Sequence, residues 1–284
     1  MMSETLNYAP LPSRALIAIS GPDWRDFLQG LITQDVATLS PGEARFGALL
    51  TAQGRLLYDL FVVGRPDGAW LDVLSEERSA ILQRLGMYRL RAKVELKPDE
   101  TPVSILFRAA SEAGPSEAPG QGWTIDPRAP GLGWRGYGAS APAGAAIVDE
   151  ETRERQKLRL GVPGPADWGS DKTYPIEANF DLLNGIDFKK GCFVGQETTS
   201  RMKRRGQVKS RMLPISFEGS APAPGSEILS GTLRAGEVLS GAAGRAMALV
   251  RLDRVEAGGL TVDGRPVVLE RPAWFVNALR TEAA

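Results

Sequence analysis

The chain has 284 residues, 43% hydrophobic and 24% charged, a globular composition for roughly two domains with no apolar stretch near the ~20 residues of a membrane span. Its 34 basic residues balance 34 acidic ones, which argues against a globally basic nucleic-acid binder, so direct nucleic-acid binding is not expected. One cysteine excludes an intrachain disulfide or a cluster held by several cysteines of one chain, and the absence of histidine excludes hydrolases with a histidine base.

The first third of the chain predicts mixed α and β structure. Residues 1–12 lack the basic region and the apolar core of a secretory signal, so we expect a cytoplasmic protein without membrane association. Apolar runs predict strands over 16–19, 46–50, 56–63, 70–74 and 103–107, and helical spacing predicts helices over 24–31 and 76–90. Residues 52–55 read as the turn of a hairpin between two of these strands.

The remainder of the chain changes character twice. Residues 109–146 are dense in Gly, Pro, Ala and Ser and predict a linker or irregular surface turns, ahead of a helix over 149–160. Later, short apolar runs between turns rich in Gly, Pro and Asp predict a small β-barrel or sandwich. We therefore expect an α+β body over residues 1–205 and a C-terminal β-barrel domain over residues 206–284.

The only cysteine stands in an unusual run, Lys-Gly-Cys-Phe-Val-Gly-Gln-Glu, at residues 190–197. Most free cysteines are buried and inert, which is the alternative reading of Cys192. Here two lysines precede Cys192 and a helix is predicted from Gly195, so positive charge and a helix N-terminus favour the thiolate. Taken alone, the basic residues 201–205 indicate a solvated helix end.

This octapeptide resembles the signature of the YgfZ family of folate-binding proteins. Upstream, Tyr-Pro-Ile-Glu-Ala-Asn at 174–179 resembles a segment that the YgfZ family shares with glycine-cleavage aminomethyltransferases, and residues 21–36, 53–55 and 161–163 follow the same pattern. The resemblance covers nearly the whole chain. It implies an aminomethyltransferase-like folate-binding body of two interlocked subdomains, followed by a small β-barrel.

The resemblance also implies a site for tetrahydrofolate or a one-carbon derivative. Glu177 matches the glutamate that accepts the pterin donor pair, and Arg211 matches an arginine beside the glutamate tail. The ligand-binding residues expected in this way are Glu177, Arg211, Lys190, Gly195, Arg201 and Lys203. Cys192 is the expected redox-active or ligand-exchange thiol. Arg14 and Arg153 fall near positions where some YgfZ proteins carry tryptophans beside folate.

Three functions follow as hypotheses. The first is a tetrahydrofolate-binding accessory protein that assembles or repairs iron–sulfur clusters, with client or assembly proteins as partners. The second is an aminomethyltransferase of the glycine-cleavage type. Residues 71–78 lack its Asn-Ala-x-Asn-x-x-Lys-Asp stretch, so Asp72 or Glu76 would have to substitute. The third is a non-catalytic folate-binding module linked to tRNA modification, although the chain has no Gly-x4-Gly-Lys-Ser/Thr phosphate loop.

Overall fold

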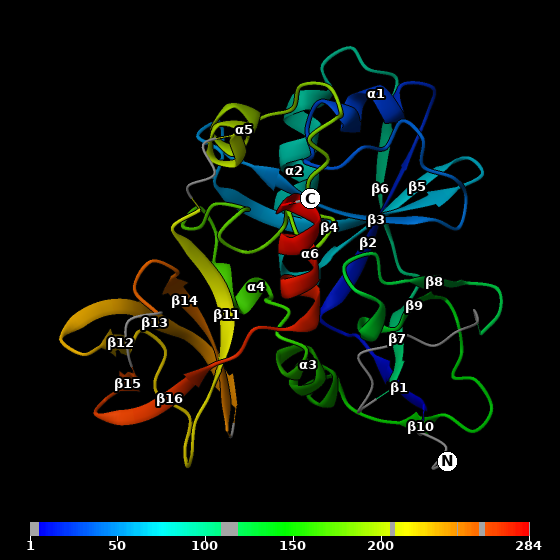
Figure 1. The fold of residues 1–284 in the computed structure, drawn as a ribbon. Helices are drawn as coiled ribbons and strands as arrows, with labels where there is room; N and C mark the ends of the chain where they lie inside the picture. The colour runs from blue at the N-terminus through cyan, green and yellow to red at the C-terminus, as the bar shows by residue number, and fades with distance from the viewer. Residues whose placement is uncertain (1–5, 109–118, 205–207, 243, 256–258, 284) are drawn as a thin grey trace.

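The computed structural model describes residues 6–108, 119–204, 208–242, 244–255 and 259–283 (Figure 1). Over these ranges the chain forms two five-stranded sheets and one closed six-stranded barrel. Figure 1 places the barrel to one side of the two sheets, with α3 (Glu150–Arg159) and α4 (Pro165–Trp168) between them. The α+β fold with a C-terminal barrel agrees with the prediction.

The larger sheet of the body has the strand order β3-β4-β5-β2-β6 and is antiparallel throughout. Its strands are β2 (Arg14–Ser20), β3 (Ala44–Leu50), β4 (Leu56–Arg65), β5 (Gly68–Leu74) and β6 (Glu95–Asp99). One face of this sheet packs against α1 (Trp24–Gln29) and α2 (Arg78–Arg89). A short 3-10 turn, η1 (Ser75–Glu77), directly precedes α2.

Alternate side chains of β4 lie on opposite faces of this sheet and join different apolar clusters. Leu60 and Val62 join the apolar cluster beneath the helices, whereas Phe61 joins a second cluster on the opposite face. Because side chains alternate along a strand, Asp59 lies on the same face as Phe61. We call this face, opposite the helices, the inner face, and the cluster that contains Phe61 the inner apolar cluster. The Asp59 carboxylate therefore lies on the inner face.

The second sheet has the order β10-β1-β7-β9-β8. Its strands are β1 (Leu6–Pro10), β7 (Val103–Arg108), β8 (Trp123–Ile125), β9 (Trp134–Tyr137) and β10 (Ala146–Ile147), with η2 (Pro130–Leu132) before β9. Three of these short strands lie in the region predicted as a linker, so that prediction is wrong for residues 119–146; residues 109–118 lie outside the described ranges. The glycines permit close packing here, because a Cβ at Gly133 would stand 2.1 Å from the Leu106 carbonyl oxygen.

The barrel closes in the order β11-β14-β13-β12-β15-β16. Its strands are β11 (Ser210–Ser216), β12 (Glu227–Ser230), β13 (Leu233–Ala242), β14 (Arg245–Arg251), β15 (Leu260–Val262) and β16 (Arg265–Leu269). A terminal helix that the sequence did not predict, α6 (Ala273–Ala283), follows the barrel. The indole of Trp274 donates a 2.8 Å hydrogen bond to the Leu160 carbonyl, which ties this helix to the body.

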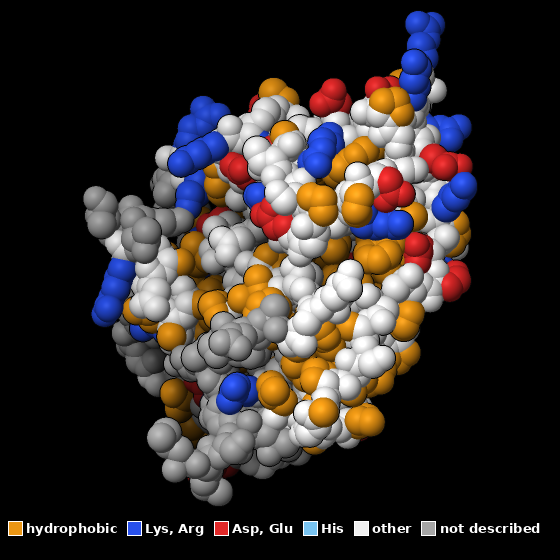
Figure 2. Space-filling view, turned by 90° about the vertical axis from the view of Figure 1, so that its right-hand side faces the viewer, with side chains coloured by type: hydrophobic (Ala, Val, Ile, Leu, Met, Phe, Trp, Pro, Cys, Tyr) orange, Lys and Arg blue, Asp and Glu red, His pale blue; other side chains and the backbone are white. Residues whose placement is uncertain are grey.

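The described surface is mixed in charge. Figure 2 shows acidic and basic side chains interspersed over the upper part of one face and hydrophobic side chains exposed across its middle. Among the described helices, none has the length and apolar character needed to cross a bilayer.

Candidate functional site

Cys192 lies in an exposed loop at residues 187–195, which we call the cysteine loop. The thiol is free and exposed. The loop leads into α5 (Gln196–Arg204), whose last turn carries Arg201, Lys203 and Arg204. Phe193, next in sequence, is buried in the inner apolar cluster, so the loop is anchored one residue away from the thiol.

Hydrogen bonds fasten the cysteine loop and the residues before it to the segment after α1. The backbone N–H of Asp187 donates to the Thr33 carbonyl at 3.0 Å, and the Thr33 hydroxyl donates to the Gly185 carbonyl at 2.6 Å. At the far end, the Val194 N–H donates to the Gly30 carbonyl at 3.1 Å. The thiol is therefore exposed on a loop that is held at both ends.

Two glycines allow the cysteine loop to cross the β3–β4 hairpin turn. Gly195 has φ of +83°, and a Cβ there would stand 2.6 Å from the Thr51 carbonyl oxygen. Gly54, on the hairpin, has the same φ, and its Cβ would stand 2.8 Å from the Gly195 carbonyl oxygen. Only glycine fits such a left-handed, close approach without strain. Gly195 thus shapes the loop rather than contacting the central cavity described below.

Lys190 fastens the cysteine loop to the segment after α1. Its ammonium donates 2.8 Å hydrogen bonds to the carbonyls of Ile32 and Gln34 and lies 5.3 Å from the centre of the Phe193 ring. Burial lowers the pKa of Lys190 to about 8, although Asp35 and Asp187 oppose the shift. Two of the three ammonium donors of Lys190 are therefore used by backbone carbonyls, and ligand binding by Lys190 stays a prediction.

The remaining cations predicted for the site lie on α5. Arg201 is exposed. Lys203 lies 3.9 Å from an Asp181 carboxylate oxygen and 5.5 Å from the centre of the Phe188 ring. Neither residue lines the central cavity. They contribute instead to a basic surface on the helix that follows the thiol.

Glu177 and Arg211, both expected at the ligand site, lie on neighbouring segments outside the central cavity. Arg211, with a side chain 3% exposed, makes a bidentate pair with Asp181 at 2.8 and 2.9 Å, and donates to the Ile176 carbonyl at 3.0 Å. The carboxylate expected from a ligand is thus supplied by the chain itself. Glu177 accepts from the Tyr174 N–H at 3.0 Å; burial raises the pKa of Glu177, while that bond and Arg55 oppose the shift. Neither side chain lines the central cavity.

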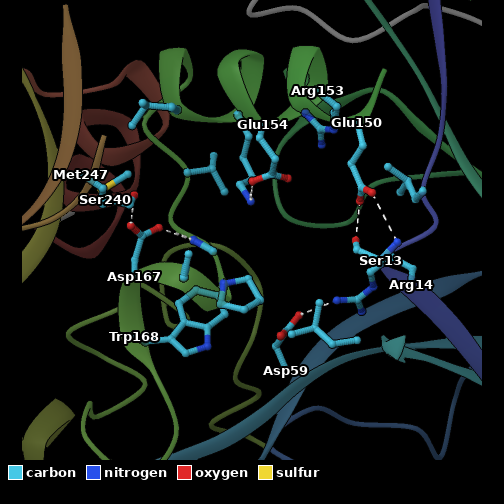
Figure 3. A pocket seen from close by; sticks show the side chains of 18 of the residues that line it. Ser13, Arg14, Asp59, Glu150, Arg153, Glu154, Asp167, Trp168, Ser240 and Met247 are labelled. Carbon is cyan, nitrogen blue, oxygen red and sulfur yellow. Dashed lines mark hydrogen bonds and ion pairs between the residues drawn. The ribbon is translucent and has the colours of Figure 1, made fainter. Parts of the chain in front are cut away.

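The central cavity has a volume of about 780 Å³ and lies where the body, α3, α4 and the barrel meet (Figure 3). Ligand sites commonly have this size and position. Arg14 and Arg153, singled out in the sequence as replacements of tryptophans, both line it. Figure 3 shows Ser240 and Met247 of the barrel on one wall and Arg14 and Asp59 of the body on the other.

The lining carries more acidic than basic side chains. The seven acidic residues are Asp59, Glu76, Glu77, Glu150, Glu151, Glu154 and Asp167. The five basic residues are Arg14, Arg128, Arg153, Arg155 and Lys157. Asp59 and Glu77 were not predicted from the sequence. Asp59 lies on the inner face of the sheet and Glu77 in the turn η1, and no local pattern distinguishes such carboxylates from those on the surface.

A buried charge network lies behind this wall. Asp72 is fully buried and accepts from Arg14 at 2.7 Å, from Arg135 and from the Tyr137 hydroxyl at 2.9 Å. Burial alone would favour the neutral acid, but Arg135 and Arg14 outweigh it and lower the pKa of Asp72. The hypothesis that Asp72 substitutes for a transferase aspartate is corrected, since its oxygens are occupied. Glu76, the other substitute considered, is exposed at the cavity rim.

Comparison with known proteins places this geometry in context. Residues 209–277 match the family model described as the CAF17 C-terminal beta-barrel domain. The chain is 34% identical over 238 residues to the mitochondrial iron–sulfur cluster assembly factor IBA57 homolog of Neurospora crassa, covering 75% of this chain and 54% of that protein. It is 32% identical over 241 residues to the mitochondrial IBA57 of Mus musculus, covering 76% of this chain and 67% of that protein. The chain thus spans little more than half of the fungal relative.

Among solved structures, the chain resembles the glycine cleavage system aminomethyltransferase T of Bartonella henselae. The TM-score is 0.75 at 18% identity, over 95% of this chain and 86% of that one. This likeness confirms the aminomethyltransferase-like fold that the sequence predicted. The cytoplasmic location predicted from the N-terminus is contradicted, because the matched relatives are mitochondrial proteins by name.

Proposed function

Because this chain belongs to the IBA57 family of iron–sulfur cluster assembly factors, a more specific relationship than the YgfZ resemblance, we propose that it presents Cys192 as a transient cluster ligand. The observation that carries the proposal is the exposed thiol on a loop fastened at both ends. A ligand that must reach a cluster on another protein has to be accessible, and a fixed loop reduces the ordering that binding requires.

The composition of the chain limits how many cluster ligands it can supply and how many must come from a partner. Protein-bound iron–sulfur clusters are usually held by four ligands, mostly cysteine thiolates. This chain has one cysteine and no histidine, so a partner protein of the assembly machinery supplies the other ligands. Lys189 in the cysteine loop and Arg201 on α5 are both exposed, and their positive charge suits a cluster that carries negative charge with its thiolates.

The test is cluster transfer with a single-atom change at the thiol. The parent and the Cys192→Ser variant are each mixed with a cluster-loaded assembly protein, and the visible circular dichroism of the cluster is followed. We expect the parent to perturb the cluster spectrum and the serine variant to leave it unchanged, with equal thermal stability of the two. An unchanged spectrum with the parent, or the same change with the serine variant, would remove the proposed role of Cys192.

The second part of the proposal is that the central cavity holds tetrahydrofolate or a one-carbon derivative. The fit is chemical: the cavity has a ligand-sized volume and is lined by the aromatic residue Trp168 and by acidic side chains, Asp59 and Glu77 among them, which can accept N–H donors. These residues, rather than Glu177 and Arg211, would hold the pterin. Tetrahydrofolate, when bound, supplies nitrogen atoms that carry a one-carbon unit.

No observation favours the transferase alternative over this assignment. Asp72, the aspartate considered for a transferase, is engaged by two arginines and a tyrosine and does not line the central cavity. Titration calorimetry with tetrahydrofolate and its one-carbon derivatives tests the folate proposal. Binding by the parent chain, also seen in Glu177→Gln, is the expected result; absence of any heat of binding up to the ligand's solubility would refute it.

A further inference from the structure

We infer that the C-terminal end of α2, beside the cysteine loop, docks a partner protein whose surface has carboxylates around an apolar pocket. The docking surface consists of five consecutive exposed residues, which we call the α2 patch: Met87, Tyr88, Arg89, Leu90 and Arg91. The inference rests on the proposed function, because it takes the partner to be the protein that brings the cluster. It adds a contact outside both the cysteine loop and the central cavity.

The first observation is that α2 ends in a group of exposed apolar side chains. Met87, Tyr88 and Leu90 are 62%, 40% and 88% exposed, whereas Ile81 and Leu85 of the same helix are buried. In the described part of the chain, three of the nine exposed large apolar side chains lie within these four residues. Exposed apolar side chains are common singly, but a contiguous group of them marks an interaction site.

The second observation is the backbone of Leu90, where α2 ends. Its φ is +41° and its ψ is −107°, a conformation that residues with a side chain rarely adopt. Helices commonly end with glycine where φ becomes positive, because glycine takes this conformation without strain. The leucine side chain does not offset the strain by burial, since it is 88% exposed. A strained residue that presents an apolar side chain to solvent is typical of a binding position.

The third observation is uncompensated positive charge. Arg89 and Arg91 are exposed, and neither makes an ion pair within the described ranges. Exposed arginines elsewhere, such as Arg155 and Arg234, each pair with a glutamate. Arginine, methionine and aromatic residues are enriched at protein interfaces and lysine is depleted, and the α2 patch contains no lysine. This composition favours an acidic protein as the occupant rather than an anionic membrane.

The α2 patch lies close to the cysteine loop. The Arg84 guanidinium donates a 3.3 Å hydrogen bond to the Leu50 carbonyl, and a Cβ at Gly195 would stand 3.0 Å from the Leu50 Cβ atom. Helix α2 and the end of the cysteine loop therefore meet at the same residue, and Figure 1 shows α2 and α5 at the same end of the molecule. Leu90 follows Arg84 by six residues, about 9 Å along a helix. A standard interface buries about 800 Å² on each partner, so one partner is wide enough to cover both surfaces.

The test is titration calorimetry of the whole chain with the assembly protein of the transfer test, freed of its cluster so that Cys192 has no cluster to bind. The variants are Leu90→Gly and the double change Arg89→Glu with Arg91→Glu. The controls are Cys192→Ser and Leu233→Ser, which alters an exposed apolar residue of the barrel. We expect each α2 variant to weaken binding about tenfold or more, and both controls to bind as the parent does.

Thermal unfolding of Leu90→Gly distinguishes docking from a structural role. Glycine relieves the backbone strain at this position, so the unfolding temperature should equal or exceed that of the parent while binding falls. Loss of binding caused by poor folding would instead lower the unfolding temperature. A lower unfolding temperature with unchanged binding would make Leu90 a structural residue and overturn the inference.

The outcomes separate this inference from the proposed role of Cys192. If the α2 variants bind the assembly protein as the parent does, the inference is overturned, and the cluster spectrum of Cys192→Ser still decides the role of the thiol. If the α2 variants weaken binding and Cys192→Ser changes the cluster spectrum as the parent does, the inference is supported and the role of Cys192 is removed. Absence of binding by the parent refutes the inference. Vesicles of phosphatidylcholine and phosphatidylglycerol are the second probe, and vesicle binding that Leu90→Gly abolishes would assign the α2 patch to a membrane and overturn the inference.

Discussion

At the scale of single residues, Gly195 gives the sharpest expectation. Because its φ is +83° and a Cβ would meet the Thr51 carbonyl oxygen, Gly195→Ala should lower the free energy of unfolding by about 1–3 kcal/mol. Gly191→Ala is the matched control, since a Cβ at Gly191 meets nothing within 4 Å. Urea unfolding measures both. Equal stability of the two variants would show that the loop crossing is not a constraint.

Glu77 leads to a prediction about pH. Its pKa of about 7 in the folded protein lies above the ordinary value of 4.5, so the folded state binds this proton more tightly than the unfolded state. Its contribution to stability is complete below pH ~4.5 and is lost as the pH rises through 7. Between pH 5 and 8 the parent should therefore lose more stability than Glu77→Gln. Thermal unfolding across this range measures the difference, and parallel curves would contradict it.

Residue-level chemistry was only partly visible in the sequence. The exposed thiol was indicated by its glycine and lysine neighbours, but one of those lysines, Lys190, turns to backbone carbonyls. Arg211 was predicted as a ligand cation from its match to an aminomethyltransferase arginine; its partner Asp181 is 30 residues away, and no local pattern joins the two. Asp59 was not predicted because no local pattern places its side chain in the lining of the central cavity.

At the scale of elements, β11 joins the barrel to the body through Arg211. Removing one partner of a buried ion pair leaves the other charge uncompensated, so Arg211→Ala should cost about 3–5 kcal/mol of stability. Arg251→Ala, on β14, removes an exposed pair with Asp253 and should change stability little. Denaturant unfolding measures both variants. A small effect of Arg211→Ala would mean that Asp181 is stabilised by other groups.

The elements with strong periodicity were predictable, and those formed by long-range pairing were not. The β3–β4 hairpin and the helix near residues 150–159 follow from local pattern, and Asp149 caps that helix by accepting from the Thr152 N–H at 2.8 Å. Strands β8, β9 and β10 are two to four residues long and pair with distant partners, so composition alone read them as linker.

At the scale of the whole molecule, barrel and body should unfold as one unit. The Met212 N–H donates to the Glu177 carbonyl at 2.8 Å, and Trp274 of α6 bonds back to Leu160. These contacts cross the boundary between the two parts. Calorimetry should show a single heat-absorption peak for the parent, and Arg211→Ala should be the variant most prone to split it. Two peaks in the parent would show that the parts are energetically separate.

The residues that line the central cavity are synthesised at different times, and those of the barrel come last. Ser240 and Met247 close the cavity from β13 and β14, whereas Asp59 and Trp168 come from much earlier in the chain. During synthesis the N-terminal elements emerge and begin to fold first. The cavity is therefore an open groove on the nascent chain until residues beyond 247 have left the ribosome. A ligand that needs all of its walls would then distinguish finished molecules from those still being made.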